Sequence, residues 1–361
     1  MTPDLISIIM PAYNGEAYIQ KAIESAIAQT YPAWELIVID DGSTDQTANV
    51  VTSIKDPRLR YIYQENKGQA AALNHGLDLV QGEYITTLDV DDWLTPDSLL
   101  ARINFLKEYP DFGAVYGDGF YCNVEGKFLK RFSEYRPTNF SGDVFDYLIT
   151  NPFYGTGANV LVRRQVFDTH QIRYDESIVW CQDWDIYIRI AAKAMYGVVD
   201  TPTIWYRLHE ANMTMSMAKK QQRDSSIRTR LKVLESPRFA SVSLRQKRIF
   251  FLQVLQNELY NRLDEQRLVI SLPQFQALPK PEQARLLRLM ANNYLLKGEH
   301  LNFAREWLNK AWALAPFDLK TALVALLVNL SPRLTKPVVK YWHQKSVTTA
   351  ELLSPLELAK G

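Results

Sequence analysis

The chain has 361 residues, of which 47% are apolar and 22% are charged, the balance of a globular protein rather than of a disordered one. Its length exceeds that of one average domain and predicts two folded units. No run of the sequence reaches the roughly 18 apolar residues that a membrane-spanning helix needs, so an integral membrane protein is not expected.

The formal net charge of +1 is unevenly distributed. Residues 1–220 carry 19 Lys and Arg against 29 Asp and Glu, whereas residues 221–361 carry 22 against 11. A basic surface attracts anionic groups. The second half is therefore expected to face anionic lipid headgroups or a phosphate-bearing acceptor, with a solvated helical surface or a surface for self-association as the alternatives.

The start of the chain and its two cysteines favour a cytoplasmic protein, with peripheral contact at the inner membrane face as an option. Residues 1–4 lead directly into a strand-like run and lack the basic start, apolar middle and cleavage site of a signal peptide. In a reducing compartment Cys122 and Cys181 are expected to be ordinary buried thiols.

Short apolar runs alternate with helix-patterned segments over the first 110 residues. This alternation predicts an α/β fold whose strand-helix-strand units form a mostly parallel sheet. Strands are expected at residues 6–10, 35–39, 59–63 and 84–88, with helices at 17–27 and 68–80. Helix caps are expected at Asn14, at Ser43 or Thr44, and at Thr95.

Periodicity is weak between residues 116 and 159, a stretch expected to form the acceptor side of the first unit. Beyond residue 218 the pattern is all-helical, which predicts an α/β domain over 1–220 and a helical domain over 221–361, with the boundary between 215 and 245. Residues 291–317 resemble one tetratricopeptide-like helical pair, with a turn at Gly298 and a stop at Pro316. A single copy does not establish an array.

Two acidic loops follow strands of the predicted sheet. Asp89 and Asp91 come directly after the fourth strand, and Asp40 and Asp41 follow the second. Ligands of open α/β sheets bind outside the carboxyl ends of the strands, where these loops converge. Carboxylate oxygens are ligands for Mg²⁺ or Mn²⁺, and a carboxylate can also accept a hydrogen bond from the N3–H of uracil or thymine or from a ribose hydroxyl. Turns and helix caps are the alternative roles.

Three linked segments carry a family resemblance: residues 7–15 (Ser-Ile-Ile-Met-Pro-Ala-Tyr-Asn-Gly), 39–45 (Ile-Asp-Asp-Gly-Ser-Thr-Asp) and 82–93 (Gly-Glu-Tyr-Ile-Thr-Thr-Leu-Asp-Val-Asp-Asp-Trp). In this order and spacing they closely resemble glycosyltransferase family 2, whose catalytic domain has the GT-A fold. The resemblance covers about residues 5 to 210.

The resemblance implies a pocket for the nucleotide base lined by Pro11, Tyr13 and Asp41. It further implies that Asp89 faces the ribose and that Asp91 binds the metal, Mn²⁺ or Mg²⁺. The donor would be a nucleotide-diphospho-sugar, with a UDP-sugar favoured.

Other matching positions extend the implied site. Lys67 or Gln69 is expected to approach the donor. His209, in a Tyr-Arg-x-His element, is expected to reach the metal or the diphosphate, and Arg207 to neutralise phosphate. Residues 155–159 are expected to let the backbone approach the acceptor, with an ordinary turn as the alternative.

Family members that invert the anomeric centre need a base, and the resemblance assigns this role to Asp183. Gln182 stands where many members have Glu, which removes one candidate charge. A carboxylate next to the acceptor hydroxyl can take its proton without a histidine. A carboxylate favoured by the helix dipole is the alternative role, and Asp185 fits it better.

Together these features predict an inverting glycosyltransferase of hexosyl or N-acetylhexosaminyl type that acts on a saccharide or lipid-linked acceptor in cell-surface polysaccharide or glycan synthesis. Nucleic acid is not an expected partner, and a homo-oligomer remains open. The alternatives are a nucleotidyltransferase for sugar phosphates and a non-catalytic sugar-nucleotide-binding scaffold. Residues 11–16 contain no Lys or Arg, which disfavours the nucleotidyltransferase.

Overall fold

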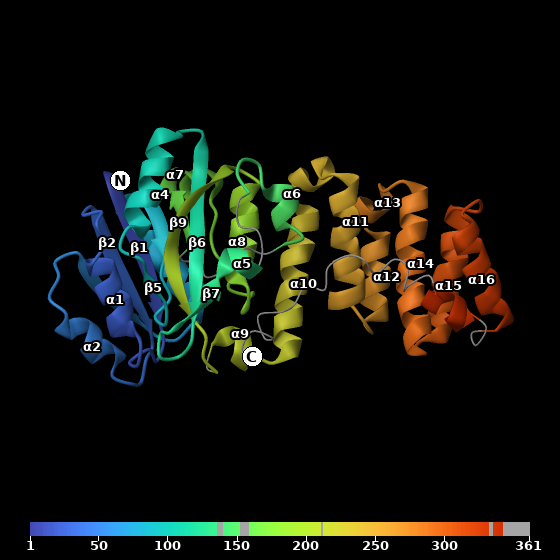
Figure 1. The fold of residues 1–361 in the computed structure, drawn as a ribbon, viewed down its shortest axis with the longest axis horizontal. Helices are drawn as coiled ribbons and strands as arrows, with labels where there is room; N and C mark the ends of the chain where they lie inside the picture. Colours follow the sequence, from blue (N-terminus) through green and yellow to red (C-terminus); the bar gives the residue numbers. More distant parts are fainter. Residues whose placement is uncertain (136–139, 152–158, 211, 332–334, 342–361) are drawn as a thin grey trace. The chain divides into compact units, whose positions relative to one another are not determined.

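The computed structural model describes residues 1–135, 140–151, 159–210, 212–331 and 335–341. The chain forms two compact units, Met1–Thr229 and Arg230–Gly361. Figure 1 shows that strands lie in the first unit and that the second is built from helices.

The strands of the first unit are β1 (Thr2–Ala12), β2 (Trp34–Asp41), β3 (Leu59–Gln64), β4 (Gly82–Thr87), β5 (Trp93–Leu94), β6 (Phe112–Cys122), β7 (Phe128–Arg131), β8 (Val160–Arg163) and β9 (Met195–Arg207). Its helices are α1 (Ile19–Ile27), α2 (Thr47–Ser53), α3 (Gln69–Leu79), α4 (Ser98–Glu108), α5 (Phe132–Tyr135), α6 (Phe145–Leu148), α7 (Arg164–His170), α8 (Gln182–Ala191) and α9 (Met213–Ser216). Helix α10 (Lys219–Glu235) contains the division between the two units.

The strands form one sheet in the order β3-β2-β1-β4-β8-β6-β9-β5, with β7 paired to β6. Strands β3, β2, β1 and β4 run parallel, which confirms the predicted parallel core. Strand β8 then pairs antiparallel with both β4 and β6. Strand β5 pairs antiparallel with β9, and β7 pairs antiparallel with β6. The sheet is therefore mixed: β6 and β9 pair parallel, and every antiparallel pair involves one of the short strands β5, β7 and β8.

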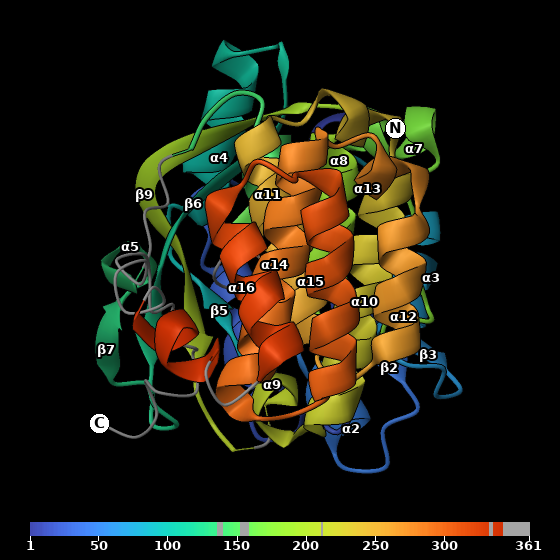
Figure 2. The same cartoon turned by 90° about the vertical axis from the view of Figure 1, so that its right-hand side faces the viewer.

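Strand β1 is buried on both faces, so its side chains alternate between two helical layers. Ile6, Ile8 and Met10 belong to the core cluster that α1 and α4 complete. Ile9 points to the other face, where α3 approaches so closely that a Cβ on Gly76 would lie 2.3 Å from Ile9 Cγ2. Figures 1 and 2 show α4 on one face of the sheet and α7 on the other. The helices cover both faces and leave the carboxyl ends of the strands to the loops.

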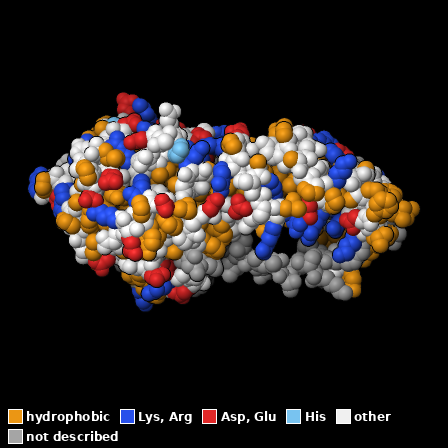
Figure 3. Space-filling view, turned by 90° about the horizontal axis from the view of Figure 1, so that it is seen from above, with side chains coloured by type: hydrophobic (Ala, Val, Ile, Leu, Met, Phe, Trp, Pro, Cys, Tyr) orange, Lys and Arg blue, Asp and Glu red, His pale blue; other side chains and the backbone are white. Residues whose placement is uncertain are grey.

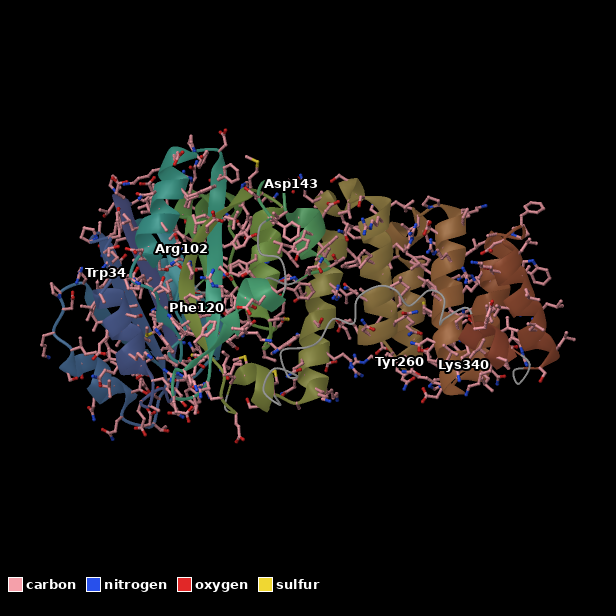
Figure 4. All side chains as sticks on the ribbon, in the orientation of Figure 1. Trp34, Arg102, Phe120, Asp143, Tyr260 and Lys340 are labelled. Carbon is pink, nitrogen blue, oxygen red and sulfur yellow. The ribbon has the colours of Figure 1, made fainter. Side chains whose placement is uncertain are left out.

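A buried arginine fixes α4 to the strand that precedes the Asp89 loop. Arg102, labelled in Figure 4, is fully buried, and burial lowers its pKa to about 9. Its Nε donates to the Ser98 carbonyl at 3.0 Å and its Nη1 to Thr86 Oγ1 on β4 at 3.3 Å. Helix α4 thereby holds the carboxyl end of β4 in place.

The predicted helix caps are wrong. Helices α1, α2 and α4 begin after Tyr18, Gln46 and Asp97, and none of these three residues makes a side-chain capping hydrogen bond. Asn14 Oδ1 instead accepts a hydrogen bond from Thr44 N at 2.8 Å, and Ser43 Oγ accepts one from Asn14 N at 2.9 Å. Thr95 Oγ1 donates to the Pro202 carbonyl at 2.6 Å. Short polar side chains that suit a cap also suit loop contacts, and here the contacts between distant loops prevail.

The stretch from 116 to 159 contains the end of β6, all of β7, and the short helices α5 and α6. The pairing of β6 with β9 shifts register around Gly117, Asp118 and Gly119. Each shift interrupts the alternation of side chains between the two faces, which explains the weak periodicity of this stretch.

The second unit contains α11 (Leu244–Leu252), α12 (Leu263–Ser271), α13 (Pro273–Gln276), α14 (Lys280–Lys297), α15 (Leu301–Leu314) and α16 (Leu319–Leu330), with a 3-10 turn at Pro237–Ser241 and a π-helical turn at Gln253–Glu258. Helix α14 ends at Gly298, whose φ of 75° is left-handed, and the chain then returns as α15. Helices α14, α15 and α16 pack side by side (Figure 2). The tetratricopeptide-like resemblance of this pair stays a prediction. No described helix is long and apolar enough to cross a bilayer.

Candidate active site

The loops after β1, β2 and β4 meet at one edge of the sheet, because these three strands are parallel neighbours. They bring together Tyr13, Asp41 and Asp89, although Tyr13 and Asp89 are 76 residues apart along the chain. This is the edge at which open α/β sheets bind ligands.

The loops after β1 and β2 are held together by hydrogen bonds from backbone N–H groups to side chains. Gly15 N donates to Thr47 Oγ1 at 2.8 Å, and Glu16 N donates to Asp45 Oδ2 at 3.0 Å. Pro11, at the end of β1, is buried. Tyr13, two residues later, is 54% exposed. A rigid loop thus presents a free aromatic ring at the edge of the sheet.

Asp41 is buried and organises the next loop. Its Oδ1 accepts hydrogen bonds from Gln64 Nε2 at 2.7 Å and from Lys67 N at 2.8 Å, and its Oδ2 accepts one from Gly68 N at 2.8 Å. A carboxylate can accept about four hydrogen bonds, so one position on Oδ2 remains for a ligand. The side chain of Lys67 is exposed. Asp40 serves the fold, since its oxygens accept from Ser43 N and the Tyr61 hydroxyl.

The three carboxylates of the loop after β4 have different partners. Asp89 Oδ1 accepts a hydrogen bond from Gln69 Nε2 at 3.0 Å. Asp91 Oδ2 accepts from Asn212 Nδ2 at 3.0 Å and lies 2.9 Å from His209 Nε2. Asp92 is buried, and its Oδ1 accepts from the backbone N–H of Arg207 at 3.0 Å. Asp89 and Asp91 therefore face the site, while Asp92 ties the loop to β9.

The side chain of Arg207 supports this loop by a hydrogen bond to the loop's backbone. Its Nε donates to the Asp91 carbonyl at 3.1 Å, and its Nη1 donates to the Val124 carbonyl. The guanidinium carbon lies 4.7 Å from the ring centre of Tyr18 and 4.9 Å from that of Trp93. In this arrangement the arginine holds the carbonyl side of the loop; contact with a phosphate stays a prediction.

Asn212 is a site residue that the sequence reasoning missed. Its Oδ1 accepts from His209 N at 2.6 Å, and its own N–H donates to the His209 carbonyl at 3.0 Å. This closed turn aims both the imidazole and the Asn212 amide at the same oxygen of Asp91. An amide three residues after a candidate ligand, in a turn, was the available signal.

Asp183 lies in the first turn of α8, after Cys181, whose φ of 54° is left-handed. Its Oδ1 accepts from Trp184 N at 2.7 Å, and burial raises its pKa to about 6. Asp185 has a structural partner, because its Oδ2 accepts from Arg189 Nη2 at 2.6 Å. Asp183 thus has a pKa close to neutral pH, while Asp185 is engaged by Arg189.

Three carboxylates lie near enough to one another for Asp89 to sense the charges of the other two. Burial, with the negative charges of Asp91 and Asp183, raises the pKa of Asp89 to about 7. Asp183 also contributes to raising the pKa of the buried Tyr174. Such an accumulation of negative charge is the environment in which a cation or a protonated group is stable.

Among the described residues, no three His, Cys, Asp or Glu side chains group as a complete metal-ligand set. The donors present still fit a hard divalent cation, because Mg²⁺ and Mn²⁺ sites at nucleotides use one or two carboxylates and take further oxygens from phosphate and water. Asp91 would supply carboxylate oxygen and His209 a ring nitrogen, and a cation would offset the negative charges that Asp91 and Asp183 place near the buried Asp89.

Of the predicted acceptor loop 155–159, residues 155–158 lie outside the described residues. Asn159 is buried, and its Oδ1 accepts from Thr203 Oγ1 at 2.6 Å and from Gly117 N at 3.3 Å. Its side chain is thus used to join strands.

The family model described as Glycosyl transferase family 2 matches residues 7–170. The first unit of this chain belongs to glycosyltransferase family 2. The match covers the loops that carry Tyr13, Asp41, Asp89 and Asp91, and ends before Asp183.

Curated glycosyltransferases are similar to part of the chain. An uncharacterized glycosyltransferase of Haemophilus influenzae is 42% identical over 133 residues, which are 36% of this chain and 53% of that protein. One of Rickettsia typhi is 32% identical over 215 residues, 58% of this chain and 66% of that protein. One of Escherichia coli, named for colanic acid biosynthesis, is 29% identical over 208 residues, 54% of this chain and 67% of that protein. The chain thus spans between half and two thirds of the length of these relatives.

Solved structures confirm the GT-A fold of this family 2 chain. S. aureus TarS 1-349 in complex with UDP-GlcNAc has a TM-score of 0.57 at 16% identity, over 97% of this chain and 95% of that one. The mannosyltransferase PcManGT from Pyrobaculum calidifontis, in complex with GDP-Man and Mn²⁺, has a TM-score of 0.50 at 19% identity, over 89% and 87%. At these identities the likeness concerns the fold.

Proposed function

We propose that this protein is an inverting glycosyltransferase that transfers a hexosyl or N-acetylhexosaminyl group from a UDP-sugar to a hydroxyl of a saccharide or lipid-linked acceptor. The observation that carries the proposal is that Asp91 and Asp183 lie near enough to Asp89 to act on its charge, with the pKa values of Asp89 and Asp183 raised to about 7 and about 6.

The donor base is proposed to lie between Pro11 and Tyr13, with its ring against the exposed face of Tyr13. The open acceptor position on Asp41 Oδ2 suits the N3–H of uracil, because Gly68 N occupies only one side of that oxygen. A uracil donates at N3, which favours UDP over nucleotides that offer no donor there. Asp89 would accept from the ribose hydroxyls, beside its bond from Gln69.

Asp91 and His209 are proposed to hold Mn²⁺ or Mg²⁺. When bound, the cation supplies charge neutralisation for the departing diphosphate. The chain prepares this position by its own bonds, since Asn212 fixes Asp91 Oδ2 and Arg207 fixes the Asp91 carbonyl. Lys67, whose side chain is exposed next to the Asp41 loop, is proposed to reach the donor.

Asp183 is proposed as the base. Its free carboxylate oxygen takes the proton of the acceptor hydroxyl while the acceptor oxygen forms a bond to the anomeric carbon. The bond from that carbon to the diphosphate oxygen breaks, and the electron pair leaves with the nucleoside diphosphate. Attack opposite to the leaving group inverts the anomeric centre. The first turn of α8 positions Asp183, because Trp184 N holds its other oxygen.

The role in the cell is proposed to be the synthesis of a cell-surface polysaccharide or glycan. Support comes from the Escherichia coli relative named for colanic acid biosynthesis.

The test is release of nucleoside diphosphate from a panel of UDP-, GDP- and dTDP-sugars, with Mn²⁺ and with EDTA. The proposal expects turnover with at least one UDP-sugar only when Mn²⁺ is present, and its loss in Asp183→Asn when an acceptor is supplied. Turnover in that variant equal to that of the unmodified protein would remove the base assignment, and metal-independent turnover would remove the role of Asp91.

A further inference from the structure

Helix α16 has two apolar faces: one is buried, and the other is exposed in the described part of the chain. Val324, Ala325 and Val328 are buried against the rest of the second unit. Four leucines lie on the opposite side and are exposed: Leu319, Leu323, Leu326 and Leu330. Their spacing of four, three and four residues places them in one stripe along the helix. We call this stripe the α16 outer face.

The residues before α16 extend this apolar surface. Phe317 is 93% exposed, and Trp312 on α15 is also exposed. Figure 3 shows hydrophobic side chains gathered at the α15–α16 end of the helical unit. Soluble surfaces do carry single exposed apolar residues, but a continuous stripe of large ones marks a binding surface.

The sequence from the start of the stripe onward is basic over residues 319–350. Residues 319–350 contain Lys320, Arg333, Lys336, Lys340 and Lys345 and no Asp or Glu. Lys320, Lys336 and Lys340 are exposed, and Figure 4 labels Lys340. The nearest preceding carboxylate is that of Asp318. Its Oδ2 accepts a hydrogen bond from Thr321 Oγ1 at 2.6 Å and lies 3.8 Å from Arg288 Nε.

A stripe of leucines with flanking lysines and exposed aromatic residues is the pattern of a helix that lies in the plane of a membrane interface. Apolar side chains enter the boundary between headgroups and acyl chains, while lysines attract anionic headgroups. A second copy of the chain suits this surface less well, because a two-fold contact would bring like-charged lysines of both copies together.

We infer that the α16 outer face docks the protein on an anionic lipid bilayer. The inference narrows the contact from the whole basic half of the chain to one helix face and its flanking lysines. It does not depend on the proposed sugar transfer, although a lipid-linked acceptor would give such docking an evident purpose.

The test is flotation of the full chain with vesicles of phosphatidylcholine alone or with about 30% phosphatidylglycerol. We expect binding to the anionic vesicles, little binding to the neutral ones, and weaker binding at high salt. Leu326→Ser with Leu330→Ser should lower the partition coefficient by roughly tenfold or more, and Lys320→Glu with Lys336→Glu by a similar factor.

The matched control is Leu268→Ser with Leu244→Ser, which changes two exposed leucines of the same unit away from the stripe. This control should bind like the unmodified chain. Donor hydrolysis in solution should be unchanged in the stripe variant, which separates this test from that of the proposed function. Absence of binding to anionic vesicles would overturn the inference. So would equal binding of the stripe variant, or a concentration-dependent dimer that the stripe variant abolishes without any vesicle binding.

Discussion

His209 Nε2 lies 2.9 Å from Asp91 Oδ2, a contact that joins the end of β9 to the loop after β4 across 118 residues of sequence. The same Asp91 oxygen accepts a hydrogen bond from Asn212. The two side chains hold the carboxylate in one orientation, which is the kind of support that metal-binding carboxylates require. The orientation of Asp91 is thus built into the fold.

Asn212 is expected to act as a positioning residue. Asn212→Ala removes the amide from Asp91 and opens the turn that aims His209, so Mn²⁺ affinity should fall by roughly 10- to 100-fold. Calorimetric titration with Mn²⁺ in the presence of UDP measures this. Asn212→Asp should restore part of the affinity, because an aspartate can still accept the His209 N–H. Unchanged affinity in Asn212→Ala would show that the turn does not support the metal.

The pH dependence of turnover should report Asp183. The base must be ionised to take a proton, and burial raises its pKa to about 6, so kcat/KM should fall as pH drops below about 6 and level off above it. Asp183→Asn should lower kcat by roughly 10²- to 10⁴-fold and remove this limb of the profile. Asp185→Asn, in the same helix, should keep the profile. If kcat/KM of Asp183→Asn still falls below about pH 6, another group is responsible for that fall.

Asp89 should make the metal-free protein less stable as pH rises. Its carboxyl pKa is raised to about 7 in the folded state, above the unfolded value, so the folded state binds more protons between these two values and stability is lost as pH rises through 7. Asp89→Asn should therefore raise the free energy of unfolding at pH 8 by roughly 1 to 3 kcal/mol and leave it little changed near pH 4. Denaturant unfolding in EDTA measures both values. The exposed Asp111→Asn is the control, and identical pH slopes for Asp89→Asn and the unmodified protein would contradict the account.

Tyr13 is expected to contribute to donor binding and not to chemistry. Tyr13→Ala should raise KM for the donor roughly three- to tenfold with little change in kcat, because a stacked aromatic ring contributes about 0.5 to 1.5 kcal/mol. The matched control is Tyr109→Ala, a tyrosine of similar exposure that precedes β6 at the opposite edge of the sheet. A fall in kcat with unchanged KM would place Tyr13 elsewhere in the mechanism.

The parts of the site that follow local rules were predictable. Asp41 and Asp89 each terminate an apolar run that reads as a parallel strand, and adjacent parallel strands deliver their carboxyl ends to one edge. The positions of these residues therefore follow from strand pattern and order alone, and the structure brings them together as predicted.

The parts that depend on distant contacts were not predictable. The residues next to Asn14 in sequence predict a helix cap, yet its partner Thr44 lies on another loop. Nothing near Arg207 in sequence indicates that it bonds the Asp91 carbonyl. The register shifts of β6 likewise depend on its pairing with β9, more than 80 residues later. Such contacts are decided by the tertiary fold, which overrides local preference.

The most direct test of the central claim is calorimetric binding of UDP to the protein and to Asp91→Asn, each with Mn²⁺ and with EDTA. Asp91 should couple metal to nucleotide, so Mn²⁺ should tighten UDP binding by roughly tenfold or more in the unmodified protein and have little effect in Asp91→Asn. Equal tightening by Mn²⁺ in both proteins would contradict the account, because the metal would then be held without the carboxylate at the centre of the site.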